Sequence, residues 1–358
     1  MITKTVIEDL NYIYNNLSSK ERQIFHGKKV LVTGYAGSLG YMLMMFFAEF
    51  GENLNIKKVY GIDNFMFGKP SWVSSLEDNP LFCLKEDDIT KCDLEPVSDA
   101  EIIFHMASLA SPVYYRQYPI ETIDADVIGL RRLLEQYKNK QIYNLVFYST
   151  SEVYGDPVNE QIPTPESYFG NVNTSGPRAC YDESKRFGET LCYNFHNKYN
   201  MPITVVRPFN SFGPGLNTND QRVVADFAKS ILENKEIIIF SDGTATRTFS
   251  YVADTTLGCI KCALYGKYDI FNIGYDKEEI TILQLAYMYK SVGERYFNYN
   301  GEVTYETHSD KHYLTDNPQR RCPNINKAKN LLNFSPQIKT LTGIKNYLKF
   351  LYEAQEVQ

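Results

Sequence analysis

Two side chains that could move a proton lie four residues apart in the stretch YDESK: Tyr181 and Lys185. In a helix this spacing puts both side chains on one face. A tyrosine has an ordinary pKa of about 10, so it needs nearby positive charge to act as a base near neutral pH. Lys185 and an oxidised nicotinamide would both supply such charge. Because YxxxK is a common pattern, the pair by itself is only a candidate for base catalysis.

A second group of polar side chains comes earlier in the chain, where the strand-like run NLVFYST (144–150) ends. Thr150, Ser151 and Glu152 follow one another there. In a parallel sheet these hydroxyls and this carboxylate would lie at the carboxyl end of a strand, which is the edge where such sheets bind ligands. We expect these three residues to complete the catalytic group.

The stretch TGYAGSLG (33–40) joins a strand-like run to a helix-like one. Its glycines, Gly34, Gly37 and Gly40, suit a tight turn that lets the backbone approach a pyrophosphate at a helix N-terminus, with Ser38 and Leu39 in the first turn. The GxxGxxG spacing alone is a weak signal. The preceding strand, the following helix and an acid at the end of the next strand strengthen it.

That acid is Asp63, in the run YGIDNF. It would bind the hydroxyls of the adenine ribose and repel a 2′-phosphate, which favours NAD over NADP. The remaining residues that we expect near the cofactor are Asn64, Asp88, Ile89 and Ala107. For Asp88 and Ile89 a purely structural role is an equally good interpretation.

Short apolar runs alternate with longer helical ones from residue 29 to about 207, which predicts an α/β fold with a doubly wound parallel Rossmann sheet. We expect a smaller, interleaved α/β substrate lobe as well. The predicted parts are a helical extension over 1–27, the Rossmann domain over 28–206 plus roughly 248–278, and the nucleotide-sugar lobe over 207–247 plus 279–358. Helices are expected over 5–17 and near 221–233, 254–265, 281–292 and 338–354.

The composition is that of a globular protein, and its charge limits the partners. Among 358 residues, 37 Lys and Arg face 43 Asp and Glu, a net charge of -6, which disfavours nucleic acid and anionic membranes as partners. No apolar run of membrane-spanning length or signal-peptide core appears. The 7 cysteines are scattered, and the only CxxC, Cys259 and Cys262, has no second half, so we expect a cytoplasmic protein without a metal site.

Taken together, TGYAGSLG, HMASLASP (105–112), YSTSEVYGDP, YDESK and RPFNSFGPG (207–215) resemble the extended short-chain dehydrogenase/reductase family, the NAD-dependent epimerases and dehydratases of sugar nucleotides. The resemblance covers roughly residues 28–350. It implies NAD as cofactor and a nucleotide sugar, specifically a UDP-sugar, as substrate. It also implies a homodimer built on two helices that begin near residues 113 and 178.

Within the family, GPRACYDESKR, QRVVADF, RTFSYVAD and PQRRCPNINKAK are most similar to the decarboxylases of UDP-glucuronate. Relatives that remove water from a hexose carry an Asp where this chain has Ser151, and the 4-epimerases generally lack Glu152. The resemblance thus implies oxidation at C4, loss of CO2 and reduction. A 4,6-dehydratase, a 4-epimerase, release of the 4-keto sugar and a degenerate nucleotide-sugar or NAD sensor remain as alternatives.

The resemblance also assigns substrate contacts. Arg247 would reach the sugar end and its carboxylate, and Asn210 the phosphates. The diphosphate would be met by arginines, whose planar guanidinium binds two oxygens at once, and a further contact is expected from a serine; these residues are Arg178, Arg222, Arg320, Arg321 and Ser111. His105 is expected to support its strand end. The chain departs from the family pattern at Asp126, where relatives show Asn.

Overall fold

The computed structural model describes residues 2–310 and 313–356, and its centre is a parallel sheet of seven strands in the order β11-β6-β5-β4-β1-β2-β3. The strands are β1 (Lys29–Thr33), β2 (Lys58–Asp63), β3 (Phe82–Glu86), β4 (Ile102–His105), β5 (Asn144–Tyr148), β6 (Ile203–Pro208) and β11 (Asp269–Ile273). The order reverses direction between β1 and β4, which makes the doubly wound arrangement. The predicted fold class is confirmed. No helix in the described ranges is long and apolar enough to cross a membrane.

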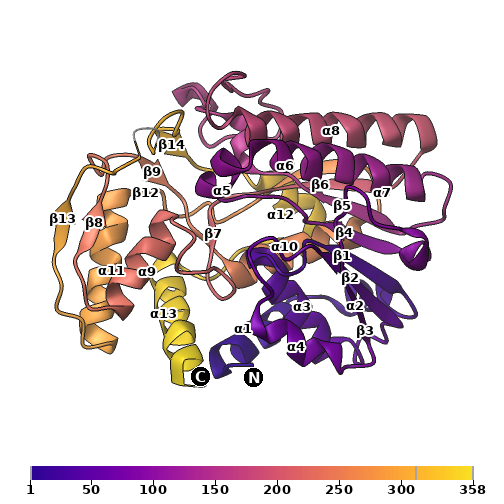
Figure 1. Cartoon of the computed structure of the whole chain (residues 1–358), viewed down its shortest axis with the longest axis horizontal. Helices are drawn as coiled ribbons and strands as arrows, with labels where there is room; N and C mark the ends of the chain where they lie inside the picture. The colour runs from indigo at the N-terminus through magenta and orange to yellow at the C-terminus, as the bar shows by residue number, and fades with distance from the viewer. Residues whose placement is uncertain (1, 311–312, 357–358) are drawn as a thin grey trace.

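Helices cover both faces of the sheet (Figure 1). On one face lie α6 (Pro119–Ile123), α7 (Leu130–Tyr137) and the long α8 (Ala179–Tyr199); on the other lie α3 (Ser38–Phe50), α4 (Ser71–Glu77) and α10 (Val252–Tyr265). Successive side chains of β1 point to opposite faces of the sheet, because side chains alternate along a strand. Val30 and Val32 belong to the apolar core on the α3 side and Leu31 to the core on the α8 side.

The chain between β4 and β5 forms a broken helix instead of a continuous one. It runs through α5 (Pro112–Gln117), α6 (Pro119–Ile123) and the π-helical turn η2 (Asp124–Gly129) into α7. Pro119 explains the first break, since proline cannot continue a helix from the preceding turn. The π turn explains the second, and such turns are frequent at functional sites. It carries Asp126, whose side chain is fully buried against α8.

The second lobe lies beyond the carboxyl ends of the strands and is built from α9, α11, α13 and three small sheets (Figure 1). The predicted helices are confirmed as α9 (Val223–Leu232), α10, α11 (Ile282–Tyr296) and α13 (Thr340–Glu356), whereas α12 (Asn326–Leu332) was not predicted. The short strands are β7 (Ser211–Phe212), β8 (Ile237–Ile239), β9 (Thr246–Arg247), β10 (Ser250–Tyr251), β12 (Ile280–Thr281), β13 (Val303–Tyr305) and β14 (Arg320–Arg321). Short 3-10 turns are η1 (Glu95–Val97), η3 (Ser151–Tyr154) and η4 (Asn159–Gln161).

The N-terminal extension joins the two parts of the molecule. The predicted helix is present as α1 (Lys4–Asn15), and it packs against α3, α10 and α13. Its N-terminal end lies beside the C-terminal helix, where the Thr5 amide donates to Glu353 at 3.1 Å. A second helix, α2 (Ser19–Ile24), was missed because its stretch SSKER is polar, although Ser18 and Glu21 form a capping box.

Candidate active site

A cleft of about 580 Å³ lies between the carboxyl ends of the sheet strands and the second lobe. All the residues predicted for catalysis and for the cofactor line it: Thr150, Ser151, Glu152, Tyr181, Lys185, Gly34, Gly37, Ser38, Leu39, Gly40, Asp63, Asn64, Asp88, Ile89 and Ala107. Of the predicted substrate contacts, Arg178, Asn210, Arg222 and Arg247 line it as well. The fold thus gathers nearly the whole predicted set into one cavity.

The glycine loop makes room for a ligand at the start of α3. A Cβ on Gly34 would lie 2.5 Å from the Cα of Ala107, and one on Gly40 would lie 2.1 Å from the carbonyl oxygen of Tyr35. Neither position therefore accepts a side chain. Gly37 caps α3 without a side-chain hydrogen bond, so the first N–H groups of the helix are left for an anion in the cleft.

Asp63 is held at the end of β2 by two backbone amides. Its Oδ2 accepts from Ala36 and its Oδ1 from Phe65, both at 2.9 Å. Burial raises the pKa of the carboxyl, and the two amides oppose that rise. Each oxygen keeps a free lone pair toward the cleft for a hydroxyl donor. The glycine loop and Asp63 therefore fit a dinucleotide without a 2′-phosphate.

Tyr181 and Lys185 lie one turn apart on α8, as predicted, and both are buried. Burial raises the pKa of Tyr181, Asp126 adds to the rise, and a hydrogen bond with Thr150 opposes it. Lys185 donates to the Tyr148 carbonyl at 2.8 Å, and its Nζ lies 2.9 Å from Asp126 Oδ1. The expected lowering of the Tyr181 pKa is not found, because burial and Asp126 outweigh the positive charge of Lys185, which is itself paired with Asp126.

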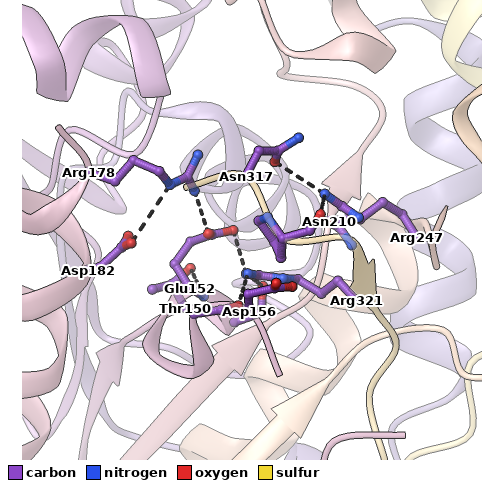
Figure 2. Close-up of polar contacts among 12 residues, drawn as sticks. Thr150, Glu152, Asp156, Arg178, Asp182, Asn210, Arg247, Asn317 and Arg321 are labelled. Atoms are coloured by element: carbon purple, nitrogen blue, oxygen red, sulfur yellow. Dashed lines mark hydrogen bonds and ion pairs between the residues drawn. The ribbon is translucent and has the colours of Figure 1, made fainter. Parts of the chain in front are cut away.

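Glu152 is held between two guanidinium groups (Figure 2). Arg178 pairs with its Oε2, and Arg321 pairs with its Oε1 at 2.5 Å while also donating to Ser151 Oγ at 3.1 Å. Burial would raise the pKa of Glu152, but the nearby arginines hold it below its usual value. Glu152 is therefore an anion in this site, and the two arginines fix its position.

Arg247 differs from the other buried arginines in its partners. Its guanidinium donates to the carbonyls of Thr246 at 2.7 Å and Gln319 at 3.1 Å, to the Pro318 carbonyl and to Asn317 Oδ1 at 3.2 Å (Figure 2). All of these acceptors are neutral. Burial and the neighbouring Arg321 lower the pKa of Arg247 to about 10. An anion bound in the cleft would relieve this unbalanced charge.

The other predicted substrate residues fall into two groups. Asn210 lies in a left-handed turn and donates to the Thr248 carbonyl at 2.9 Å, and Arg222 pairs with Asp220, both at the wall of the cleft. Ser111, Arg320 and Arg321 do not line it. The Ser111 hydroxyl donates a hydrogen bond to the Asp220 carbonyl at 3.0 Å. Arg320 pairs with Glu279, which does not line the cleft. Arg321, expected at the diphosphate, lies behind Glu152.

Three side chains near Tyr181 were missed by sequence reasoning. Asp126 pairs with Lys185, and Tyr115 stacks on Tyr181 with ring centroids 5.0 Å apart. Asp182 Oδ2 lies 3.8 Å from Nε of Arg178, the arginine that also pairs with Glu152. Burial and the charge of Glu152 raise the pKa of Asp182 to about 7. The departure of Asp126 from the family pattern was visible, but its partner was not, because 59 positions separate it from Lys185 along the numbering.

His105 and the cysteines also have defined surroundings in the structure. His105 is buried, its Nδ1 lies 2.8 Å from Thr33 Oγ1, and burial lowers its pKa to about 3, so it supports the strand end as a neutral ring. All seven cysteines are free thiols. Among the described residues, no three His, Cys, Asp or Glu side chains gather as they would around a metal ion.

Comparison with known proteins agrees with this geometry. The model of the NAD dependent epimerase/dehydratase family matches residues 30–274. UDP-glucuronic acid decarboxylase 1 of Xenopus tropicalis is 34% identical over 344 residues, which is 96% of this chain and 75% of that protein. UDP-glucuronic acid decarboxylase 3 of Arabidopsis thaliana is 34% identical over 317 residues, 88% of this chain and 86% of that one.

Solved structures give the same picture. UDP-glucose 4-epimerase of Thermotoga maritima with UDP-glucose superposes with a TM-score of 0.78 at 26% identity, over 91% of this chain and 99% of that one. UDP-glucuronic acid 4-epimerase of Bacillus cereus, solved with UDP-glucuronic acid and NAD, gives a TM-score of 0.74 at 25% identity over the same shares. The chain belongs to the NAD dependent epimerase/dehydratase family.

Proposed function

We propose that this protein is an NAD-dependent enzyme that decarboxylates UDP-glucuronate to UDP-xylose through a 4-keto intermediate. The observation that carries the proposal is the cluster of Arg178, Arg321 and Arg247 beside the predicted catalytic residues, which holds more positive charge than Glu152 balances. A sugar that bears a carboxylate supplies the missing negative charge. The similarity to UDP-glucuronic acid decarboxylases over about nine-tenths of the chain supports the same substrate.

The cofactor is NAD, held by the glycine loop, the first turn of α3 and Asp63, and it supplies a hydride acceptor and donor at C4. Tyr181 is the base that takes the proton of the C4 hydroxyl. Thr150, which is hydrogen-bonded with Tyr181, lies close enough to bind the same oxygen. Lys185 is held beside Tyr181 by Asp126 and the Tyr148 carbonyl.

Once C4 is a ketone, the C5 carboxylate is β to it, and loss of CO2 leaves an enolate that the ketone stabilises. This chemistry needs an oriented carboxylate more than a strong acid. Arg247 supplies a charge for orienting it. Ser151 and Glu152, fixed by Arg321, lie where they would hold the water or group that returns a proton to C5.

The same residues disfavour the alternative reactions. A dehydratase needs a carboxylic acid to protonate the departing C6 hydroxyl, and Ser151 is far too weak an acid for this step. Its hydroxyl is moreover engaged by Arg321. A simple 4-epimerase needs no anion at the position of Glu152, yet this chain commits Arg178 and Arg321 to it.

The test is to incubate the purified protein with UDP-glucuronate, UDP-glucose and dTDP-glucose in parallel and to follow the product masses. Loss of 44 mass units, the mass of CO2, from UDP-glucuronate alone is the expected result, with a pentose as final product. A product that keeps the ketone would show release of the 4-keto sugar. Loss of water from a hexose, an isomer of unchanged mass, or binding without turnover would contradict the proposal and favour the dehydratase, the epimerase or the sensor.

We also propose that the protein is a cytoplasmic homodimer. The outer face of α6, η2 and α8 exposes a row of apolar side chains, Ile120, Ile123, Ile128 and Phe187, which are 62%, 37%, 45% and 49% exposed. A second copy packed on this face would bury them. The seven free thiols suit a reducing compartment. Light scattering of the wild type and of Phe187→Glu tests the dimer, and the variant is expected to be monomeric.

A further inference from the structure

The buried ion pair beneath Tyr181 bears on when this tyrosine works as a base. Asp126 and Lys185 are both almost completely removed from solvent, with side chains 0% and 3% exposed. Lys185 Nζ lies 2.9 Å from one carboxylate oxygen, and Ser184 donates to the other at 2.8 Å. The pair is therefore fixed from both sides and not free to dissociate as a surface pair would.

The geometry brings the pair to the predicted base itself. Lys185 Nζ lies 5.8 Å from the centre of the Tyr181 ring, and Asp126 acts on Tyr181 as the strongest charge among its neighbours. A lysine alone would favour the tyrosinate, whereas a carboxylate disfavours it. Because the two charges are in contact, their fields at the phenol largely cancel.

We propose that Asp126 is a positioning residue that acts through Lys185 to set the pH at which Tyr181 becomes a base, keeping it a neutral phenol in the resting enzyme. The activating positive charge then has to come from elsewhere in the cleft. This inference rests on the proposed role of Tyr181 in C4 oxidation. It does not depend on which reaction follows that oxidation.

The other groups that face Tyr181 do not replace the lost lysine charge. Glu152 of η3 and Asp182 of α8 are carboxylates near the phenol, and Arg222 lies at the start of α9. Tyr115 of α5 is a second phenol and stacks on the Tyr181 ring. Both carboxylates act in the same direction as Asp126 and raise the pKa of Tyr181. Arg222 is engaged by Asp220. The balance at the phenol therefore depends mainly on Asp126.

The test is the pH profile of kcat/KM, from pH 6 to pH 10, for the wild type, Asp126→Asn and the control Glu183→Gln. Asparagine keeps the size of the side chain and an oxygen for Lys185 but removes the charge. We expect the acid limb of the profile to move to lower pH in Asp126→Asn, with kcat/KM at pH 6.5 rising about tenfold for each pH unit of the shift. Glu183 is on the same helix but is 37% exposed and pairs with Arg186, so its variant should keep the wild-type profile.

An acid limb that does not move in Asp126→Asn, or a uniform fall of the rate at every pH, would overturn the inference and leave Asp126 a structural residue. If the variant does not fold, as judged by its melting temperature, the wild-type profile decides alone. If kcat/KM of the wild type has already reached its plateau below pH 7, Tyr181 is not held as a neutral phenol and the inference is overturned. A wild type without any turnover would instead refute the proposed function.

Discussion

The two sides of the reacting centre carry buried charge in opposite ways. On the Tyr181 side, one cation and one anion, Lys185 and Asp126, are in contact and cancel. On the Glu152 side, Arg178 and Arg321 pair with Glu152, whereas the guanidinium of Arg247 donates only to neutral acceptors. The first side suits a neutral phenol, and the second suits an added anion.

These two arrangements suit two different steps of the proposed reaction, oxidation on the Tyr181 side and decarboxylation on the Glu152 side. The oxidation removes a proton from a hydroxyl, so it needs a base whose charge appears only when the substrate is in place. The substrate of the decarboxylation carries a carboxylate, so its binding and orientation are served by cationic groups fixed in advance. In this molecule the fixed cations lie around Glu152, and the conditional base lies on α8.

The largest expected effect is on kcat, when Tyr181, the proposed base, is replaced. Tyr181→Phe removes the phenol oxygen but keeps the ring stacked on Tyr115, so the fold and ligand binding should be preserved. We expect kcat to fall by roughly 10²–10⁴-fold, the usual contribution of a general base. The measurement is product formation by mass spectrometry, with binding followed by calorimetry. Turnover close to that of the wild type would remove Tyr181 from the mechanism.

The second effect breaks the cationic side. Arg247→Met removes the one arginine of the cluster whose contacts are all neutral acceptors. The KM for UDP-glucuronate should rise roughly 10- to 100-fold, as expected for losing hydrogen bonds to a charged group, while the affinity for UDP-glucose should change much less. Arg320→Met is the matched control, since Arg320 pairs with Glu279 outside the cleft. Equal losses for both sugars would show that Arg247 does not meet the carboxylate.

A third effect, on stability instead of catalysis, extends the comparison to α1, where a buried acid has a phenol as its hydrogen-bond partner. Asp9 is 3% exposed and accepts a hydrogen bond from Tyr251 at 2.6 Å, and burial raises its pKa from 3.8 to about 7. Because the folded-state pKa is above the ordinary one, Asp9 supports folding fully below about pH 4, and this support is lost as the pH rises through 7.

Asp9→Asn removes that pH dependence and keeps an acceptor for Tyr251. Relative to the wild type, the variant should therefore gain unfolding free energy between pH 4 and pH 8, on the order of 2–4 kcal/mol. Denaturant unfolding at the two pH values measures the gain. Glu52→Gln, which changes an exposed acid that does not act on Asp9, is the control. A difference that is the same at both pH values would contradict a buried, protonated Asp9.

The cofactor side of the cleft could be predicted from the sequence almost completely, because it is local. Gly34 to Gly40 lie on one turn, and Asp63 ends the neighbouring strand, so their types and spacing define their geometry. The charge pairs could not be predicted. The ionic contacts of Glu152 with Arg321 and of Lys185 with Asp126 join distant segments. The packing of η2 on α8 brings the second pair together, and the hydrogen bonds of Arg321 with Ser151 and Gly155 hold the first.

In the proposed mechanism CO2 leaves from a 4-ketone and C5 is then protonated, and one reaction run in D2O tests both steps. UDP-glucuronate is converted with the NAD-loaded protein, and the product is read by mass spectrometry and proton NMR. We expect a UDP-pentose with one deuterium at C5 and none at C4, because the hydride removed from C4 returns there. A product that keeps its carboxylate, lacks deuterium at C5 or carries it at C4 would refute this mechanism.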